Sequence, residues 1–316
     1  MPFLIAAAAS LSLTPLVIAG ARKLGLVDRP GALKVHGRPV PLGGAAVAAG
    51  AIGAVLVSDA AGKVWLGIAI VVAFATGVLD DRRTIRPSGR LFLQGAAVGA
   101  VLAAGAEIAP LGPLGPVSGA LVVLATINAV NMVDGQDGLA SGLVVIAGVG
   151  LAVVAGGGAG AIAPLAAAGA ASGFLPWNLP PARAFLGDGG AYVLGLLLAV
   201  GAIEVSSGGW SEVLAAGACL GIFAYELVST VLRRLGRRMP ALAGDRDHAY
   251  DRLAAAVGSR AGSTYVMWIA GGIAALIGSV VLALPTAVGA IVVATATAIA
   301  AAIHLRLRPV IPEVPR

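Results

Sequence analysis

Acidic side chains that could do chemistry stand at a few positions in an otherwise apolar sequence. Asp80 and Asp81 are adjacent at the end of an apolar stretch, where two carboxylates repel each other unless a cation neutralises them. Oxygen ligands of this kind suit a hard divalent cation, Mg²⁺ above all, which also suits phosphate substrates. The alternative is a solvated helix end held by the neighbouring Arg82 and Arg83, and this pair alone does not decide between the two.

A second group of polar residues follows with regular spacing. Asn131, Asp134 and Asp137 are three residues apart, and Gly135 and Gly138 among them favour a turn that exposes backbone N–H groups. Such amides beside carboxylates can grip a nucleotide or a metal-bound phosphate. The alternative is a capped turn between two helices. Such a turn needs Asp and Gly, but it does not need Asn residues at the end of the membrane-spanning stretch.

Three further positions carry polar groups with functional potential. Asp188 lies between glycines just before an apolar stretch, where a helix cap explains it by itself. His248 lies among the aspartates and arginines of residues 245–252, a mixture that can bind phosphate and tune a proton acceptor. Glu226 lies inside an apolar stretch, which makes it a functional candidate, although pairing with a neighbouring helix would also satisfy it.

Long apolar stretches must position these groups. Of the 316 residues, 59% are hydrophobic and 11% charged, and the mean hydropathy is +0.96. Soluble domains carry about 25% charged residues, so the composition excludes a soluble domain. It predicts an all-α polytopic membrane protein, with one transmembrane catalytic domain over residues 1–316.

Eleven stretches of roughly 15–20 residues are predicted to span the membrane. They lie near residues 3–20, 44–58, 64–79, 91–106, 117–133, 139–156, 160–176, 190–205, 213–232, 264–282 and 286–305.

The basic residues predict the orientation. Every Lys and Arg except Lys63 follows an odd-numbered stretch, so the positive-inside rule places the N-terminus outside and the C-terminus in the cytoplasm. The N-terminus lacks a basic signal-peptide region, and the first stretch is expected to be retained. The net charge of +6 follows from this topology and from anionic lipid, without nucleic acid as a partner. All the polar clusters fall on the cytoplasmic side, in loops near residues 21–43, 80–90, 128–138, 177–189 and 233–263.

Together these loops resemble the polyprenyl-phosphate N-acetylhexosamine-1-phosphate transferases, from about residue 28 to residue 253. The family includes the phospho-N-acetylmuramoyl-pentapeptide transferase and the bacterial N-acetylglucosamine-1-phosphate transferases. Its Asp-Asp pair falls on Asp80 and Asp81. Its Asn-rich motif and its Phe-x-Gly-Asp motif fall on Asn128, Asn131, Asp134, Asp137, Phe185, Gly187 and Asp188.

The resemblance implies a reaction and a cofactor. A sugar-1-phosphate, expected to be N-acetylglucosamine-1-phosphate, would pass from a UDP-sugar to undecaprenyl phosphate in the cytoplasmic (inner) cell membrane, releasing UMP and starting a cell-envelope polysaccharide. Mg²⁺, or Mn²⁺ in its place, would bind to Asp188 with Asp81. Homodimerisation is implied as well.

Residue roles follow from the same resemblance. The catalytic residues are expected to be Asp80, as base or nucleophile, with Asp81, Asp134 and His248. Substrate contacts are expected from Asn128, Asn131, Asp137, His36, Arg90 and Arg252. Both a one-step route and a two-step route through Asp80 stay open.

The sequence departs from the family pattern at a few positions. A Lys usual in the second motif is Arg90, a common Ser is Ala191, and the fifth loop has His248 and Tyr250 where many relatives have His-x-His-His. With eleven predicted spans and a cytoplasmic C-terminus, the chain resembles the N-acetylglucosamine type more closely, whereas the changed fifth loop leaves the identity of the sugar open.

A transporter for anions or lipid-linked substrates, with a polar cytoplasmic mouth, is the alternative. It would need charges and helix breaks near the bilayer midplane and inverted internal symmetry. Glu226 is the one clear intramembrane charge in the sequence, and no internal symmetry is apparent. The transferase is therefore favoured.

Overall fold

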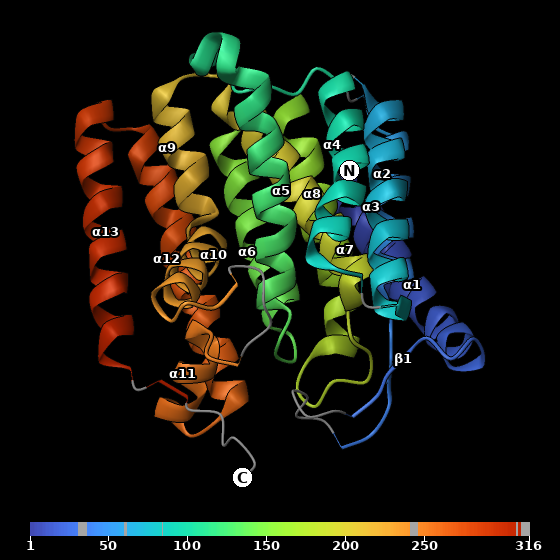
Figure 1. Cartoon of the computed structure of the whole chain (residues 1–316). Helices are drawn as coiled ribbons and strands as arrows, with labels where there is room; N and C mark the ends of the chain where they lie inside the picture. The colour runs from blue at the N-terminus through green and yellow to red at the C-terminus, as the bar shows by residue number, and fades with distance from the viewer. Residues whose placement is uncertain (31–36, 60–61, 84, 241–245, 308, 311–316) are drawn as a thin grey trace.

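The computed structural model describes residues 1–30, 37–59, 62–83, 85–240, 246–307 and 309–310, and it is 79% helical, which confirms the all-α class (Figure 1). The long helices of these residues are α1 (Pro2–Lys23), α2 (Gly44–Leu56), α3 (Lys63–Arg83), α4 (Pro87–Ala103), α5 (Gly115–Val133), α6 (Leu139–Val154), α7 (Ile162–Asn178), α8 (Gly187–Ser206), α9 (Trp210–Cys219), α10 (Gly221–Gly236), α11 (Ala249–Val257), α12 (Arg260–Leu282) and α13 (Thr286–Arg306). Short elements are the 3₁₀ helices η1 (Ala109–Leu114) and η2 (Ala159–Ala161) and the antiparallel strands β1 (Val27–Asp28) and β2 (Val40–Pro41).

Helix α8 forms the centre of the bundle. It has no distinct polar face, as is typical of a helix enclosed by protein. Within its most apolar stretch of 18 residues, 94% is buried. Helices α2, α3, α5, α6, α7 and α9 all contact it. Helix α13 lies at the periphery. Only 6% of its most apolar stretch of 18 residues is buried, so its apolar side chains face outward. An apolar exterior around an apolar core is the arrangement that lipid requires.

Glycines allow the helices next to α8 to approach its backbone. A Cβ atom on Gly77 of α3 would collide with the backbone of Asp188 and Gly189. A Cβ atom on Gly195 of α8 would lie 2.7 Å from the Cα atom of Ile127 on α5. Small residues at such crossings are typical of helices packed in membranes, where close contact replaces the hydrophobic effect.

The predicted spans all fall on helices. In the described part of the chain, seven helices are long and apolar enough to cross a membrane alone, and the number is eight if the bent pair α9 and α10 forms one span. Helices α2 and α6, with 13 and 16 residues, are shorter than that requirement. The chain is therefore a multi-pass membrane protein in which some predicted spans are short helices.

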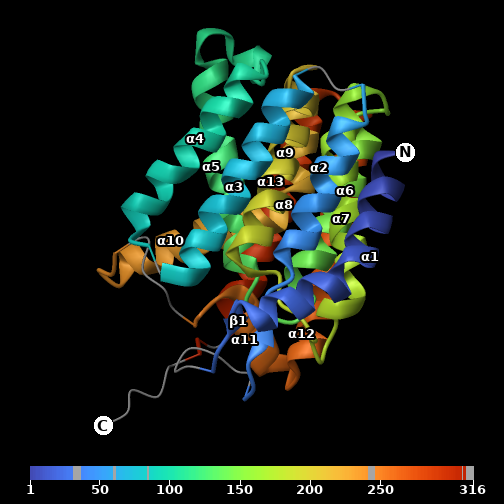
Figure 2. The ribbon, with the colours of Figure 1, turned by 90° about the vertical axis from the view of Figure 1, so that its right-hand side faces the viewer.

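The ninth predicted span is not a single straight helix. Its residues divide into α9 and α10, whose axes differ by 75°, and Figure 2 shows α10 running across the bundle. One face of α10 buries Glu226 and Thr230, while Val228, Leu232 and Leu235 on the other face are exposed. The bend brings this amphipathic helix to the polar end of the bundle, which suits its charged residues better than hydrocarbon. Helix α11, inside the fifth predicted loop, was also not anticipated from the sequence.

The predicted loops meet at one end of the bundle, where α1 and α13 also end (Figure 1). The Gly43 amide donates to the Phe185 carbonyl at 2.7 Å, which joins the first loop to the fourth. The Gln136 side chain donates to the Tyr250 carbonyl at 3.2 Å, which joins the third loop to the fifth. These bonds bring segments far apart in the sequence into a single polar surface.

The close approach of α3 and α8 generates a prediction. Gly77→Ala should lower the free energy of unfolding by about 1–3 kcal/mol, because the added methyl group meets backbone that cannot rotate away. Thermal unfolding of the detergent-purified protein measures this. Gly99→Ala on α4, where a Cβ atom meets nothing within 4 Å, is the control and should leave the protein as stable or more stable. Equal unfolding temperatures for the two variants would contradict the packing argument.

Candidate active site

Carboxylates from three helices gather at the N-terminus of α8. Asp80 and Asp81 lie in the last turn of α3, Asp134 follows the last residue of α5, and Asp188 is in the first turn of α8. Burial of the Asp134 carboxyl group raises its pKa well above the usual value, and the negative charges of Asp188, Asp81 and Asp137 raise it further. Asp80, Asp81, Asp134 and Asp188, which the sequence analysis singled out, thus form one cluster in space.

Asp80 is a buried carboxylate with fixed partners. Its Oδ1 atom accepts the backbone N–H of Ile85 at 2.8 Å, and its Oδ2 atom accepts the Tyr192 hydroxyl at 2.9 Å. The Arg90 Nη1 atom lies 3.6 Å from the same Oδ2 atom. Tyr192 was missing from the predicted site, although a tyrosine in an apolar helix generally needs a partner for its hydroxyl group. These contacts hold Asp80 in one orientation.

Asp81 accepts hydrogen bonds from the first amides of α8. The N–H groups of Asp188 and Gly189 donate to its carboxylate at 3.1 and 3.3 Å. These amides have no partner within their own helix, and a carboxylate at this end also meets the positive pole of the helix dipole. The turn into α8 needs a glycine, because Gly187 has a φ of +70°. Asp81 therefore links the end of α3 directly to the segment that carries Asp188.

The residues of the third loop have different surroundings. Asn131 lies beside Asp188 and belongs to the acidic cluster. The Asn128 amide instead donates to the Gln94 side chain and to the Leu124 carbonyl, each at 2.8 Å, between α4 and α5. The Asp137 carboxylate accepts the backbone N–H of Ala182 at 2.9 Å, between the third and fourth loops.

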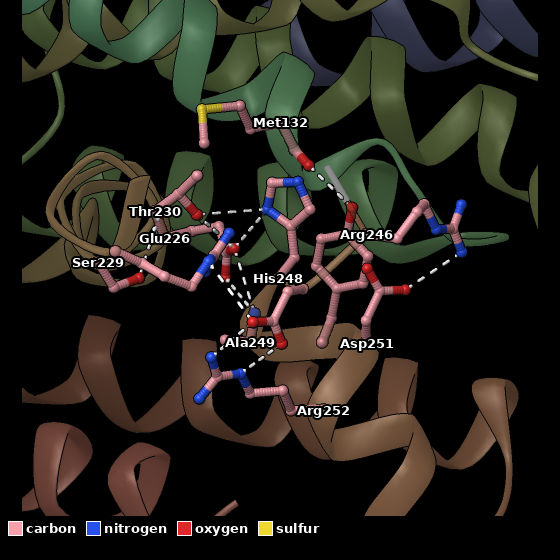
Figure 3. A network of polar contacts seen from close by, with 12 residues as sticks. Met132, Glu226, Ser229, Thr230, Arg246, His248, Ala249, Asp251 and Arg252 are labelled. Carbon is pink, nitrogen blue, oxygen red and sulfur yellow. Dashed lines mark hydrogen bonds and ion pairs between the residues drawn. The ribbon is translucent and has the colours of Figure 1, made fainter. Parts of the chain in front are cut away.

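His248 lies at the end of α5, against the third loop (Figure 3). Its Nδ1 atom is 2.7 Å from an oxygen of Glu226, and its ring stacks on Tyr250 with centroids 5.1 Å apart. The Tyr250 hydroxyl donates to the carbonyl of Met132 at 3.1 Å. Tyr250 therefore connects the histidine of the fifth loop to the end of α5.

Arg252 forms a two-point ion pair with Asp247, and both contacts are 2.8 Å long. Burial favours a higher pKa for Asp247, but the bonds from Arg252 and the Val310 amide and the charge of Arg233 hold it below the usual value. Arg252 thus anchors the fifth loop, and its contact with substrate stays a prediction. His36 lies outside the described residues.

The acidic cluster suits a divalent cation. Asp81 and Asp188 offer hard oxygen ligands beside Asp134, whose pKa is raised by burial and by these neighbouring carboxylates. Among the described residues, no three His, Cys, Asp or Glu side chains are grouped closely enough to hold a metal by themselves. Mg²⁺ is usually held by one or two carboxylates together with substrate phosphates, so this donor set fits Mg²⁺.

Comparisons with known proteins identify a matching family and similar transferases. Residues 64–206, which include Asp80, Asp134 and Asp188, match glycosyl transferase family 4. A protein of Bacillus subtilis (strain 168) named "Probable undecaprenyl-phosphate N-acetylglucosaminyl 1-phosphate transferase" is 30% identical over 289 residues, which cover 85% of this chain and 81% of that protein. The "Undecaprenyl-phosphate alpha-N-acetylglucosaminyl 1-phosphate transferase" of Thermotoga maritima is 30% identical over 254 residues, which cover 76% of this chain and 77% of that protein.

The bond between Tyr192 and Asp80 generates a prediction. Tyr192→Phe keeps the ring but removes one donor from a buried carboxylate, and the free energy of unfolding should fall by about 1–3 kcal/mol. Thermal unfolding in detergent measures the loss. Tyr265→Phe, which alters a half-exposed ring on α12, is the matched control and should change stability by less than about 0.5 kcal/mol. The interpretation is wrong if Tyr192→Phe is as stable as this control.

Proposed function

The chain belongs to glycosyl transferase family 4, and we propose that it transfers N-acetylglucosamine-1-phosphate from a UDP-sugar to undecaprenyl phosphate, releasing UMP. The observation that carries the proposal is the carboxylate cluster at the N-terminus of α8, which stands at the polar end of an apolar bundle. Such a site can handle a charged diphosphate while the bundle surface accommodates a lipid chain. The reaction would supply the first lipid-linked sugar of a cell-envelope polysaccharide.

The transfer exchanges one phosphoanhydride bond for another. An oxygen of the lipid phosphate forms a bond to the sugar-bearing phosphorus of the UDP-sugar. The bond from that phosphorus to the bridging diphosphate oxygen breaks, and its electron pair leaves with UMP. The attacking phosphate is already ionised, so the protein mainly has to align the two phosphates and stabilise their charge.

The described side chains divide these tasks. Arg90 lies beside Asp80 and can orient the attacking phosphate, while Asn131 and Asp134 border the nucleotide side. His248, which stacks on Tyr250 near the end of α5, would contact a phosphoryl oxygen. The donors on Asp80 stabilise its negative charge and so reduce its reactivity toward phosphorus, which favours the one-step route over a covalent intermediate.

A divalent cation completes the proposal. Asp188 and Asp81 would hold Mg²⁺, or Mn²⁺ in its place, and when bound it would neutralise charge on the diphosphate. Asp81 would then bind the cation and also accept hydrogen bonds from the first amides of α8.

The proposed topology places this site in the cytoplasm, with the N-terminus outside and up to eleven spans in one transmembrane catalytic domain. Basic residues support it, because they occupy the last turns of α1, α3, α10 and α13. By the positive-inside rule the ends of these helices face the cytoplasm. Homodimerisation stays a prediction from the family resemblance.

The transporter alternative is not favoured, because both relatives are named as transferases. It would gain support only from flux of substrate into liposomes without turnover. UMP production without flux would exclude it.

UMP release by the purified protein tests the proposal. The assay combines undecaprenyl phosphate, Mg²⁺ and a panel of UDP-N-acetylhexosamines, and turnover with UDP-N-acetylglucosamine that EDTA abolishes is the expected result. Asp188→Asn should lower kcat by about a hundredfold or more. The variant loses a carboxylate that would hold the cation, and the negative charge of the diphosphate would then be stabilised less well.

Glu107→Gln is the matched control, since it removes one exposed carboxylate at the opposite end of the bundle and should keep its turnover. Full Mg²⁺-dependent turnover by folded Asp188→Asn protein would rule out the assigned metal site. Absence of turnover with every donor, from folded wild-type protein, would rule out the proposed reaction.

A further inference from the structure

A glutamine buried between α4 and α5 carries a donor group that has no partner in the described part of the chain. Gln94 of α4 is 0% exposed. Its Oε1 atom accepts a hydrogen bond from the side chain of Asn128 on α5 at 2.8 Å. Its Nε2 atom is buried and makes no hydrogen bond to any described residue. A buried NH₂ group without an acceptor costs stability, so its presence needs an explanation.

Asn128 determines which way the Gln94 amide points. The side-chain nitrogen of Asn128 donates to the Leu124 carbonyl at 2.8 Å, and only a donor can make this contact because a carbonyl oxygen accepts. The same nitrogen faces Gln94, so Gln94 must present its oxygen there. Turning the amide over would place two NH₂ groups against each other. The NH₂ group of Gln94 is therefore directed away from Asn128.

A second donor lies on the same face of α4. Arg90 precedes Gln94 by four residues, so the two side chains are neighbours on the helix surface. The Nη1 atom of Arg90 lies 3.6 Å from Asp80 of the acidic cluster, while its buried Nε atom has no hydrogen-bond partner among the described residues. Gln94 lies about 6 Å farther along α4, away from the polar end of the bundle. The face thus offers N–H donors beside the acidic cluster, which suits an anion rich in oxygen.

We propose that Gln94 is a substrate-binding residue whose NH₂ group donates to a phosphoryl oxygen of the lipid phosphate, beside Arg90. The inference rests on the proposed function and deepens it, because it adds a binding residue for the attacking phosphate. Such a residue is left with an unused donor in the protein alone, since its acceptor belongs to the substrate.

The position of α4 favours the lipid phosphate over the UDP-sugar as the acceptor. Helix α4 lies at the edge of the bundle, where it packs mainly on α3 and α5 (Figure 2). Phe92, between Arg90 and Gln94 in the sequence, is 82% exposed, so α4 presents an apolar side chain outward. A phosphate on a membrane lipid can therefore approach Gln94 along this edge. The nucleotide is instead proposed to lie by Asn131 and Asp134 at the polar end.

Gln94→Leu tests the assignment, because leucine is of similar size and has no donor. We expect KM for undecaprenyl phosphate to rise by about tenfold or more, as a hydrogen bond to a charged group is lost. KM for UDP-N-acetylglucosamine should stay within about twofold. Both constants are measured from UMP release at a fixed detergent concentration. An unchanged KM for the lipid, which a water molecule bound to Gln94 would predict, overturns the proposal. A rise in KM for the UDP-sugar as large as that for the lipid overturns it as well.

Val98→Ala is the matched control for loosening α4. Val98 lies one turn beyond Gln94 on the same face and is 7% exposed, and the substitution removes buried methyl groups without removing a polar group. It should lower the unfolding temperature and leave both KM values within about twofold. A rise in KM for the lipid as large as that of Gln94→Leu would show that loosening of α4 is the cause, and would contradict the proposed contact.

A binding measurement without turnover separates this inference from the proposed reaction. Undecaprenyl phosphate and undecaprenol, which lacks the phosphate, are added separately to the protein in detergent, and the unfolding temperature is recorded. The phosphorylated lipid should raise it more than undecaprenol does in wild-type protein, and Gln94→Leu should remove most of this difference.

Equal shifts with the two lipids in wild-type protein would overturn the proposal, and so would an undiminished difference in Gln94→Leu protein. If folded wild-type protein releases no UMP from any donor, the proposed reaction fails. The unfolding temperatures then still decide whether Gln94 binds a lipid phosphate.

Discussion

Negative charge at the N-terminus of α8 is the constraint around which this end of the protein is built. The Asp81 carboxylate accepts the first amides of α8, and this contact requires α3 to lie against the α8 backbone at Gly77. Asp134 and Asp188 add further charge at the same place, where burial and mutual repulsion raise the pKa of Asp134. The surrounding bonds, from Tyr192 to Asp80 and from Ala182 to Asp137, keep these carboxylates in place despite their repulsion. Several carboxylates thus lie close together at the polar end of the bundle, and their oxygens are the kind of ligand that a divalent cation prefers.

The sequence was sufficient for the features that depend on local composition. Apolar stretches located the helices, and acidic motifs located the cluster, because lipid excludes charge wherever it occurs in the chain. Pairwise contacts depend instead on how closely two helices approach, and no local pattern encodes that distance. The Tyr192 hydroxyl therefore could not be assigned to Asp80, nor the Glu226 carboxylate to His248, before the helices were placed.

The bend between α9 and α10 is a second feature that could not be predicted from the sequence. Residues 213–232 contain a single acidic residue, Glu226, so a count of apolar residues reads them as one continuous span. The structure turns the chain by 75° after Cys219, because the polar face of α10 finds its partners in the fifth loop. Hydropathy measures how much of a segment is apolar, whereas the direction of a helix follows from which of its few polar groups must be satisfied.

The enclosure of α8 has a consequence for the order of biosynthesis. Of the described helices that pack most extensively against it, α2, α3, α5, α6 and α7 precede it in the chain and α9 follows. Most of the helices that surround α8 are therefore synthesised before it. Helix α8 then has to pack between helices that are already present. Asp81, Asn131 and Asp134 precede α8 in the chain, whereas Asp188 is made with it. Insertion of α8 brings Asp188 to them, so the acidic cluster is complete only after α8 has been made, and the fifth loop with His248 follows later in the chain.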